Sequence, residues 1–352
     1  MDRRKAVLWA GTALLLGLVA WKLHTSHFDW GAFWQACRRV DARLLVLATL
    51  ILYLNFPCRA ARWAVLLKPS FPAGGQPAWW RLTGSQFIGF AGLAALGRIG
   101  ELIRPYLVSR RTGLTFSSQI AVVAVERIFD LGAFGILFAG NLLLSSQLNN
   151  LPYHNRYHLF GYAIAAAIAV LSLFVAFTLY AGEAVARLLG GIAGKVSRSA
   201  GIAVAARVLE FRQGLNTIGS FSDFLLASFY SLLTWLSIAV SYVVVLRAFP
   251  APLHSMTISH VVLLMGFSVV GSVVQLPGIG GGAQLLTITA LTVLFGIPRE
   301  LASSAGLILW VVSSMSVILP GVIFARVEQV SLRSVAQQSG QAKELHEPHP
   351  VH

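Results

Sequence analysis

Residues 120–144 read IAVVAVERIFDLGAFGILFAGNLLL, an apolar run whose only charged residues are Glu126, Arg127 and Asp130. At 1.5 Å of rise per residue, a helix of this length measures about 38 Å, enough to cross the roughly 30 Å hydrocarbon core of a bilayer. The run lacks the alternation of polar and apolar residues that marks the strands of a membrane β-barrel. It therefore predicts a membrane-spanning α-helix with ionisable side chains inside the membrane.

The composition of the whole chain agrees with this interpretation. Of 352 residues, 56% are hydrophobic and 11% are charged, whereas a soluble globular protein has about 25% charged residues. This argues against a soluble enzyme, a disordered protein and a coiled coil. Further apolar runs predict spans at Ala6–Leu23, Leu44–Phe56, Leu159–Tyr180, Phe224–Phe249 and Leu301–Ala325. The predicted fold is an all-α polytopic membrane protein with about six full spans.

Two shorter apolar elements are interrupted, and they predict broken or re-entrant helices. The first is Gly84–Leu96, with its break near Gly97. The second consists of Val261–Val274 and Leu285–Phe295 and is split by QLPGIGGGAQ at residues 275–284. Each glycine or proline costs a helix interior about 1–3 kcal/mol, so this second element is not expected to form one continuous helix. Paired interrupted helices are typical of a transport site at the centre of a bundle.

The free amide groups of the half-helix that follows the glycine-rich loop predict an anion site near Ala283. A tight structural turn is the alternative interpretation. The candidate residues in this loop are Pro277, Gly278, Gly280, Gly281 and Gln284.

Basic residues orient the predicted spans, because cytoplasmic loops are enriched in Lys and Arg. With the N-terminus inside, the inside segments hold 19 Lys and Arg residues and the outside segments hold 5. Both termini are therefore expected in the cytoplasm. Residues 1–325 would form the transmembrane domain, with 181–223 as a basic interfacial loop, and residues 326–352 a polar, disordered tail. The net charge of +14 fits an anionic leaflet, and nucleic acid is not an expected partner.

Two groups of ionisable residues lie beside the interrupted element Gly84–Leu96 and near the inner interface. In the sequence GRIGELIRP at 97–105, Arg98, Glu101 and Arg104 are spaced three apart, which would place one carboxylate between two guanidinium groups on a helix. A self-neutralised surface helix is the alternative. Asn55, Arg59 and Arg62 share a second helix face. Here snorkelling to lipid phosphate, without a specific role, is the favoured interpretation. The run Leu44–Phe56 is short, and Pro57 and these arginines are expected to end it.

Glu126, Arg127 and Asp130 form the third group. Glu126 and Asp130 are four residues apart and share a face of the predicted helix 120–144. Charged side chains at membrane depth are costly and usually mark a site or a partner. The sequence predicts either a structural ion-pair lock to the arginines, or a proton or cation relay, or one wall of a headgroup cavity.

These motifs resemble the flippase-like transmembrane domain of lysylphosphatidylglycerol synthases, a family that also occurs as free-standing membrane proteins. The resemblance covers about residues 5–325. The matching residues are Arg59 and Arg62-Trp63 with Leu66-Leu67, Gly97-Arg98 and Gly100-Glu101 with Arg104, Glu126-Arg127 with Asp130, and Pro277-Gly278 with Gly280. The resemblance implies movement of a lipid, or of a lipid-linked intermediate, between leaflets.

The chain departs from the family pattern in two places. The family commonly has a Glu where this sequence has Gln284, so this position lacks the family's carboxylate. Only about 27 residues follow the last predicted span, which leaves no room for the soluble aminoacyl-transferase domain of the two-part synthases. The chain is therefore not expected to make aminoacyl lipids, and a separately encoded lipid-modifying enzyme is a conceivable partner.

The favoured function is translocation of an anionic phospholipid or a polyprenyl-phosphate-type lipid through a polar cleft. Arg59, Arg62, Arg98 and Arg104 would capture the headgroup, while Glu101, Glu126 and Asp130 would set the charge of the cleft or carry protons. Arg127 is a further candidate binding residue. A membrane-embedded enzyme acting on lipid phosphates and a lipid- or partner-binding scaffold are the alternatives. No cofactor or metal is expected, and the expected location is the bacterial inner membrane.

Overall fold

The computed structural model describes residues 28–329 except 73, 216–217, 274 and 277–279. The predicted first span, Ala6–Leu23, and the tail from residue 330 lie outside the described residues. So do Pro277 and Gly278 of the glycine-rich loop, and the side chain of Arg98.

The described chain begins with three consecutive helices. They are α2 (Trp30–Arg38), α3 (Ala42–Tyr53) and α4 (Asn55–Leu67), followed by the 3₁₀ turn η1 (Lys68–Ser70). Helix α3 with the start of α4 covers the predicted short span Leu44–Phe56. The expectation that Pro57 and the arginines end the run is wrong. Pro57 lies in the first turn of α4, where a proline removes no helical hydrogen bond. The helical chain therefore continues past Pro57, and Ala42–Ser70 forms one apolar stretch of 29 residues.

The next segment contains the first predicted break. Helix α5 (Trp79–Leu96) leads into the 3₁₀ helix η2 (Gly97–Leu102) and then into α6 (Ile103–Thr112). Gly97 has a φ of +65°, a left-handed conformation that glycine adopts without strain. A Cβ on Gly100 would overlap the backbone of Gly92, so η2 folds back against the helix that precedes it.

Long helices form the middle of the chain. Helix α7 (Phe116–Leu144) and the 3₁₀ turn η3 (Ser146–Asn150) precede α8 (His154–Gly194), which is kinked at Ala181, and α9 (Arg198–Leu215) and α10 (Phe221–Arg247) follow. Most of the α8 surface is exposed: only 6% of its most apolar window is buried. Such a helix needs lipid or a partner to cover its apolar side chains.

The second predicted break is also present. After the 3₁₀ turn η4 (Leu253–Ser255) come α11 (Ile258–Gly271), the two-residue strands β1 (Gln275–Leu276) and β2 (Gly280–Gly281), and α12 (Gly282–Val293). The two strands pair antiparallel. The chain then runs through α13 (Arg299–Trp310), the π-helical turn η5 (Val311–Met315) and α14 (Ile318–Val327).

The all-α fold class is confirmed for the described residues, in which β1 and β2 form the one short ladder. Within the part of the chain that the structure describes, four helical stretches are long and apolar enough to cross a membrane: Ala42–Ser70, His154–Val175, Phe221–Arg247 and Arg299–Val327. The number of six spans and their orientation stay predictions.

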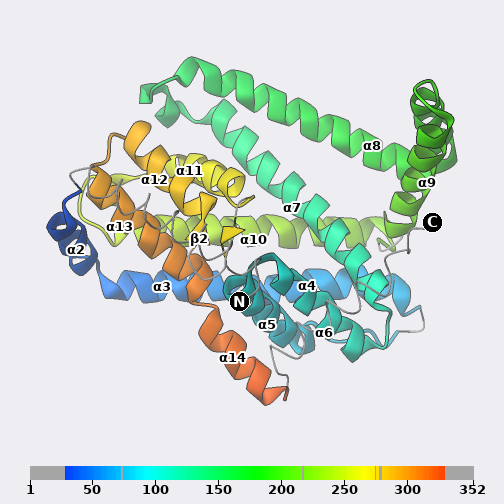
Figure 1. Ribbon diagram of the computed structural model, residues 1–352, viewed down its shortest axis with the longest axis horizontal. Coiled ribbons are helices and arrows are strands. Elements are labelled where there is room, and N and C mark those ends of the chain that lie inside the picture. Colours follow the sequence, from blue (N-terminus) through cyan, green and yellow to red (C-terminus); the bar gives the residue numbers. More distant parts are fainter. Residues whose placement is uncertain (1–27, 73, 216–217, 274, 277–279, 330–352) are drawn as a thin grey trace, which may run out of the picture.

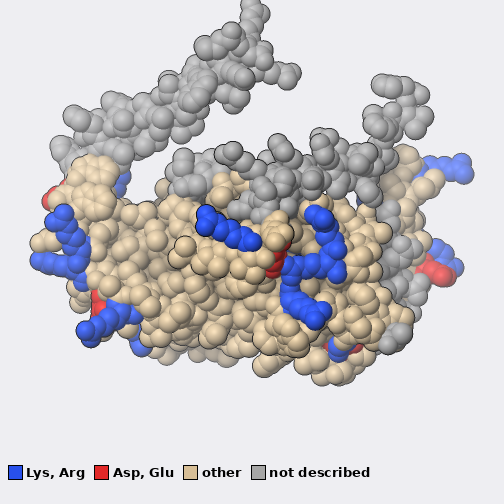
Figure 2. Space-filling view, turned by 90° about the horizontal axis from the view of Figure 1, so that it is seen from below, with Lys and Arg blue, Asp and Glu red and all other residues tan. Residues whose placement is uncertain are grey.

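Helices α3 and α4 run beside α10 along the length of the molecule, and α7 packs against α4, α6, α8 and α10 (Figure 1). Helix α5 packs against α4, α6 and α14. Helix α2 and the turn between α7 and α8 lie at one end of Figure 1, and α9 lies at the other. The face drawn in Figure 2 is mostly uncharged, with a small group of basic side chains around an acidic one near its middle.

Candidate functional site

Five charged side chains from three helices meet in the interior, and we call them the arginine cluster: Arg59 and Arg62 of α4, Arg104 of α6, and Glu126 and Asp130 of α7. All five are buried. Glu126 and Asp130 lie one turn apart on α7, as their spacing of four predicts. The structure therefore joins residues from all three of the charged groups that the sequence singles out.

Arg62 lies at the centre of the cluster and is fully buried. Its Nη1 donates to Asp130 Oδ1 at 2.6 Å and to Ser231 Oγ of α10 at 2.6 Å. Its Nη2 donates to Glu126 Oε1. One guanidinium group thus binds both carboxylates and ties α4 to α7 and α10.

Arg104 reaches the same carboxylate from α6. Its Nη2 lies 2.6 Å from Glu126 Oε2, and its Nη1 donates to Gln86 Oε1 of α5 at 3.1 Å. The guanidinium group also stacks over the Trp63 ring, 4.6 Å from its centroid. A Cβ on Gly89 would stand 2.6 Å from the Arg104 Cβ, so a glycine on α5 allows Arg104 to enter the interior.

Arg59 is held more loosely than the other two arginines. Its Nη1 lies 3.5 Å from Asp130 Oδ2 and 3.6 Å from Glu126 Oε1. Its shortest polar contact is the hydrogen bond from Nε to Asn55 Oδ1, at 2.6 Å. Of the three guanidinium groups, that of Arg59 therefore has the weakest contacts with the carboxylates.

The arginine cluster carries an excess of positive charge and of hydrogen-bond donors. Three arginines face two carboxylates, which leaves one positive charge unbalanced among the described residues. In addition, two buried donors, Arg62 Nε and Gln86 Nε2, lack a hydrogen-bond partner in the described part of the chain; one buried acceptor, Glu126 Oε2, also lacks one, although it makes the ion-pair contact with Arg104. Buried charges and donors are costly unless an acceptor satisfies them. An anion with several oxygen atoms would supply both the charge and the acceptors.

Glu101 and Arg127 are not brought into the arginine cluster. The predicted pairing of Glu101 with Arg104 does not form, because the Arg104 guanidinium group contacts Glu126 of α7. Glu101 instead lies 3.5 Å from Arg127 Nη2, and both side chains are about half exposed. This second ion pair is a surface contact, which contributes little to stability.

The glycine-rich loop lies next to the first break. Strand β1 packs against η2, so the two interruptions, distant in the sequence, meet in space. A Cβ on Gly271 would overlap the backbone of Gly282, the first residue of α12. Gly280 and Gly281 form β2, and Gln284 is half-buried in the first turn of α12.

Several residues around the arginine cluster were not predicted as site residues. Gln86 is a fully buried amide in the run Gly84–Leu96, and its polarity within an apolar run was the available signal. Ser231 and Phe90 gave no such signal, since a serine or a phenylalanine in an apolar helix is ordinary. Among the described residues, no three His, Cys, Asp or Glu side chains converge to hold a metal ion.

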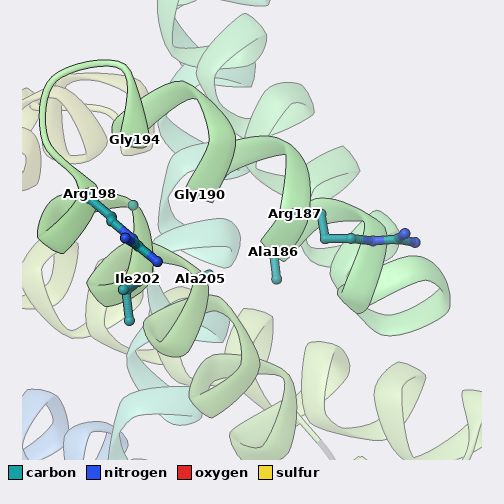
Figure 3. A pocket seen from close by; sticks show the side chains of 8 residues that line it. Ala186, Arg187, Gly190, Gly194, Arg198, Ile202 and Ala205 are labelled. Carbon is teal, nitrogen blue, oxygen red and sulfur yellow. The ribbon is translucent and has the colours of Figure 1, made fainter.

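A separate pocket of about 330 Å³ lies between α8 and α9 (Figure 3). Arg187 and Arg198 line it together with small residues that include Gly190, Gly194 and Gly201. It belongs to the predicted interfacial segment 181–223, and none of the arginine-cluster residues lines it.

Comparison with known proteins identifies relatives of this chain. The chain is 26% identical over 312 residues to a UPF0104 membrane protein of Methanothermobacter thermautotrophicus, covering 83% of this chain and 85% of that protein. It is 31% identical over 142 residues to Glycosyltransferase AglD of Haloferax volcanii, covering 39% of this chain and 22% of that protein. The aligned part is thus about a fifth of that relative's length.

The family model described as the lysylphosphatidylglycerol synthase TM region matches residues 8–321. The matched range contains both helix breaks and every member of the arginine cluster. The chain is therefore a multi-pass membrane protein that belongs to the family of the lysylphosphatidylglycerol synthase transmembrane region.

Proposed function

We propose that this protein binds the phosphate-bearing headgroup of an anionic lipid at the arginine cluster and moves the lipid between leaflets. The observation that carries the proposal is the unbalanced positive charge of the cluster, at a site where buried N–H groups lack acceptors. Arginine binds phosphate oxygens through a planar fork of donors. The ligand class is a phospholipid or a polyprenyl-phosphate-type lipid, and the proposed location is the bacterial inner membrane.

The helix breaks support transport over simple lipid binding. The backbone at η2 and at β1–β2 is irregular, and the two interruptions pack against each other. Irregular backbone at membrane depth is tolerated where protein or a polar cavity surrounds it, and interrupted helices are a feature of transporter sites. In this proposal the headgroup passes along the breaks while the acyl chains stay in the lipid. Gly280, Gly281 and Gln284 would contact it there, together with Pro277 and Gly278.

The charged residues have different roles in this proposal. Arg59 captures the headgroup because, of the three arginines, it makes the weakest contacts with the carboxylates. Arg62 fixes Glu126 and Asp130 in place, and Arg104 contributes its remaining donors. Arg98 and Arg127 would attract the headgroup at the edge of the site, where Glu101 pairs with Arg127.

A second candidate is a membrane scaffold that presents a lipid to a separately encoded lipid-modifying enzyme. The observation that favours it is the name of one relative, a glycosyltransferase, of which this chain matches about a fifth. A scaffold would bind lipid without moving it, and an embedded enzyme would change lipid phosphates even in detergent, where the two leaflets no longer exist.

Lipid binding by the purified protein in detergent tests the proposed site. Short-chain phosphatidylglycerol should bind, and phosphatidylcholine should bind more weakly. Arg59→Gln should weaken binding of the anionic lipid roughly tenfold or more, because a buried charge-assisted contact is worth about 1.5–3 kcal/mol. Arg110→Gln is the matched control, since Arg110 is an exposed arginine on the same helix as Arg104. Equal binding by wild type and Arg59→Gln would contradict the proposal.

A further inference from the structure

Phe90 of α5 lies against the two arginines at the edge of the arginine cluster. The Arg59 Cζ is 5.0 Å and the Arg104 Cζ is 5.3 Å from the centroid of the Phe90 ring. Among the described aromatic side chains, Phe90 is the one whose ring contacts two guanidinium groups of the cluster. The face of an aromatic ring carries partial negative charge and attracts a cation.

The arginine with the weakest contacts to the carboxylates, Arg59, lies at this position. Arg62 is bound by both carboxylates, whereas Arg59 approaches neither closer than 3.5 Å. An aromatic face offers no lone pair to an N–H group, so it stabilises a guanidinium group less well than an oxygen anion does. A phosphate placed between Arg59 and Arg104 would make stronger contacts than the ring makes.

Phe90 also differs from the other rings near it. Tyr53, Phe56, Phe87 and Phe324 form a packed aromatic row, with the Phe56 and Phe87 centroids 4.2 Å apart and those of Phe87 and Phe324 5.2 Å apart. Phe56 and Phe87 are buried. Phe90 joins the end of this row at Phe56, at 5.4 Å, and is only half-buried. Its ring can therefore turn away from the arginines without opening the row.

We propose that Phe90 is a displaceable cover of the anion site. Its ring lies across Arg59 and Arg104 when no headgroup is bound, and the headgroup phosphate takes its place on binding. The identity of the occupant rests on the proposed function, but the cover is testable without any lipid.

Phenylglyoxal, which reacts with accessible guanidinium groups, tests the cover directly. The purified protein is treated in detergent, and the modification of each arginine is followed by peptide mass spectrometry. Phe90→Leu should raise the reaction rates of Arg59 and Arg104 about two- to fivefold, as expected for loss of a cation–π contact, while Arg62 stays protected. Phe87→Leu is the matched control, because Phe87 lies on the same helix and in the same aromatic row, and no contact with an arginine of the cluster is seen for its ring. Phe90→Trp keeps a ring and should react like wild type.

The outcomes separate this inference from the proposed function. An unchanged rate of arginine modification in Phe90→Leu, or an equal rise of that rate in Phe87→Leu, would contradict the proposal that Phe90 covers the site. Short-chain phosphatidylglycerol should bind Phe90→Leu about two- to fivefold more tightly than wild type, since the ring no longer competes. Weaker binding by Phe90→Leu would make the ring part of the binding surface and would also overturn the cover. If Phe90→Leu raises the arginine reactivity but no variant binds anionic lipid, Phe90 covers the two arginines and the proposed function is wrong.

Discussion

Arg104 Nη2 of α6 lies 2.6 Å from Glu126 Oε2 of α7, across the contact between the two helices. The same carboxylate group binds Arg62 through its other oxygen. Glu126 is therefore the residue through which α4, α6 and α7 are joined, and it sets the charge that the arginine cluster presents to a ligand.

Replacing Glu126 with Gln should destabilise the protein strongly. The change leaves three arginines facing Asp130 alone, and breaking a buried ion pair by removing one partner costs about 3–5 kcal/mol. Thermal unfolding of the purified protein in detergent measures this loss. Glu101→Gln is the control, because the exposed pair of Glu101 and Arg127 should contribute at most about 1 kcal/mol. Similar melting temperatures for the two variants would contradict the account.

Arg62→Gln and Arg59→Gln each remove one positive charge, but the first should mainly lower stability and the second should mainly weaken lipid binding. Loss of Arg62 removes contacts to both carboxylates and to Ser231, and should cost about 3–5 kcal/mol of stability. Loss of Arg59 leaves two arginines facing two carboxylates, so the fold should persist while anionic lipid binds roughly tenfold more weakly or worse. Melting curves and lipid titrations of both variants check this pair. A stable Arg62→Gln protein with an unfolded Arg59→Gln protein would reverse the assigned roles.

Gln86→Glu should neutralise the surplus positive charge of the arginine cluster with a carboxylate of the protein itself. The Gln86 Oε1 atom already accepts from Arg104 Nη1 at 3.1 Å, so a carboxylate at this position would neutralise the surplus charge without a change of shape. The variant should melt no lower than wild type, and it should bind anionic lipid about tenfold more weakly or worse, as expected for loss of a charge-assisted contact. Gln86→Leu removes the amide without adding charge and serves as the control. Undiminished lipid binding by Gln86→Glu would show that the surplus charge is not what the ligand recognises.

Gly100→Ala and Gly271→Ala should disrupt the two helix breaks. In each case the added Cβ would overlap a neighbouring backbone, that of Gly92 or that of Gly282, and a backbone cannot move aside as a side chain can. We expect a fall in stability of about 1–3 kcal/mol, the usual cost of overpacking, and a loss of lipid movement. Gly140→Ala on α7 meets nothing within 4 Å and should be neutral or slightly stabilising, because Ala favours helix over Gly. Thermal unfolding of the three variants decides between these expectations.

Local sequence patterns predicted much of this structure. The spacing of Glu126 and Asp130 placed both carboxylates on one helix face, and the glycines at 97 and 280–282 marked both helix breaks. These features depend on helix periodicity and on backbone freedom, which act over a few residues.

The partners of each charge could not be predicted in the same way. Helical spacing paired Arg104 with Glu101, but Arg104 instead enters the interior past Gly89 and reaches Glu126 on another helix. Pro57 appeared to end a span because proline breaks helix interiors, whereas here it occupies a first turn. Which helices cross, and which serine or amide lies at the crossing, depends on contacts between distant segments.

Transbilayer movement of lipid in proteoliposomes tests the central claim most directly. Fluorescent phosphatidylglycerol and a polyprenyl phosphate are followed across the bilayer for wild type, Arg59→Gln and the control Arg110→Gln, with and without pH and sodium gradients. The account predicts movement by wild type and by Arg110→Gln, and a return to the protein-free rate for a folded Arg59→Gln. Absence of movement for every anionic lipid, or equal movement by Arg59→Gln, would contradict it.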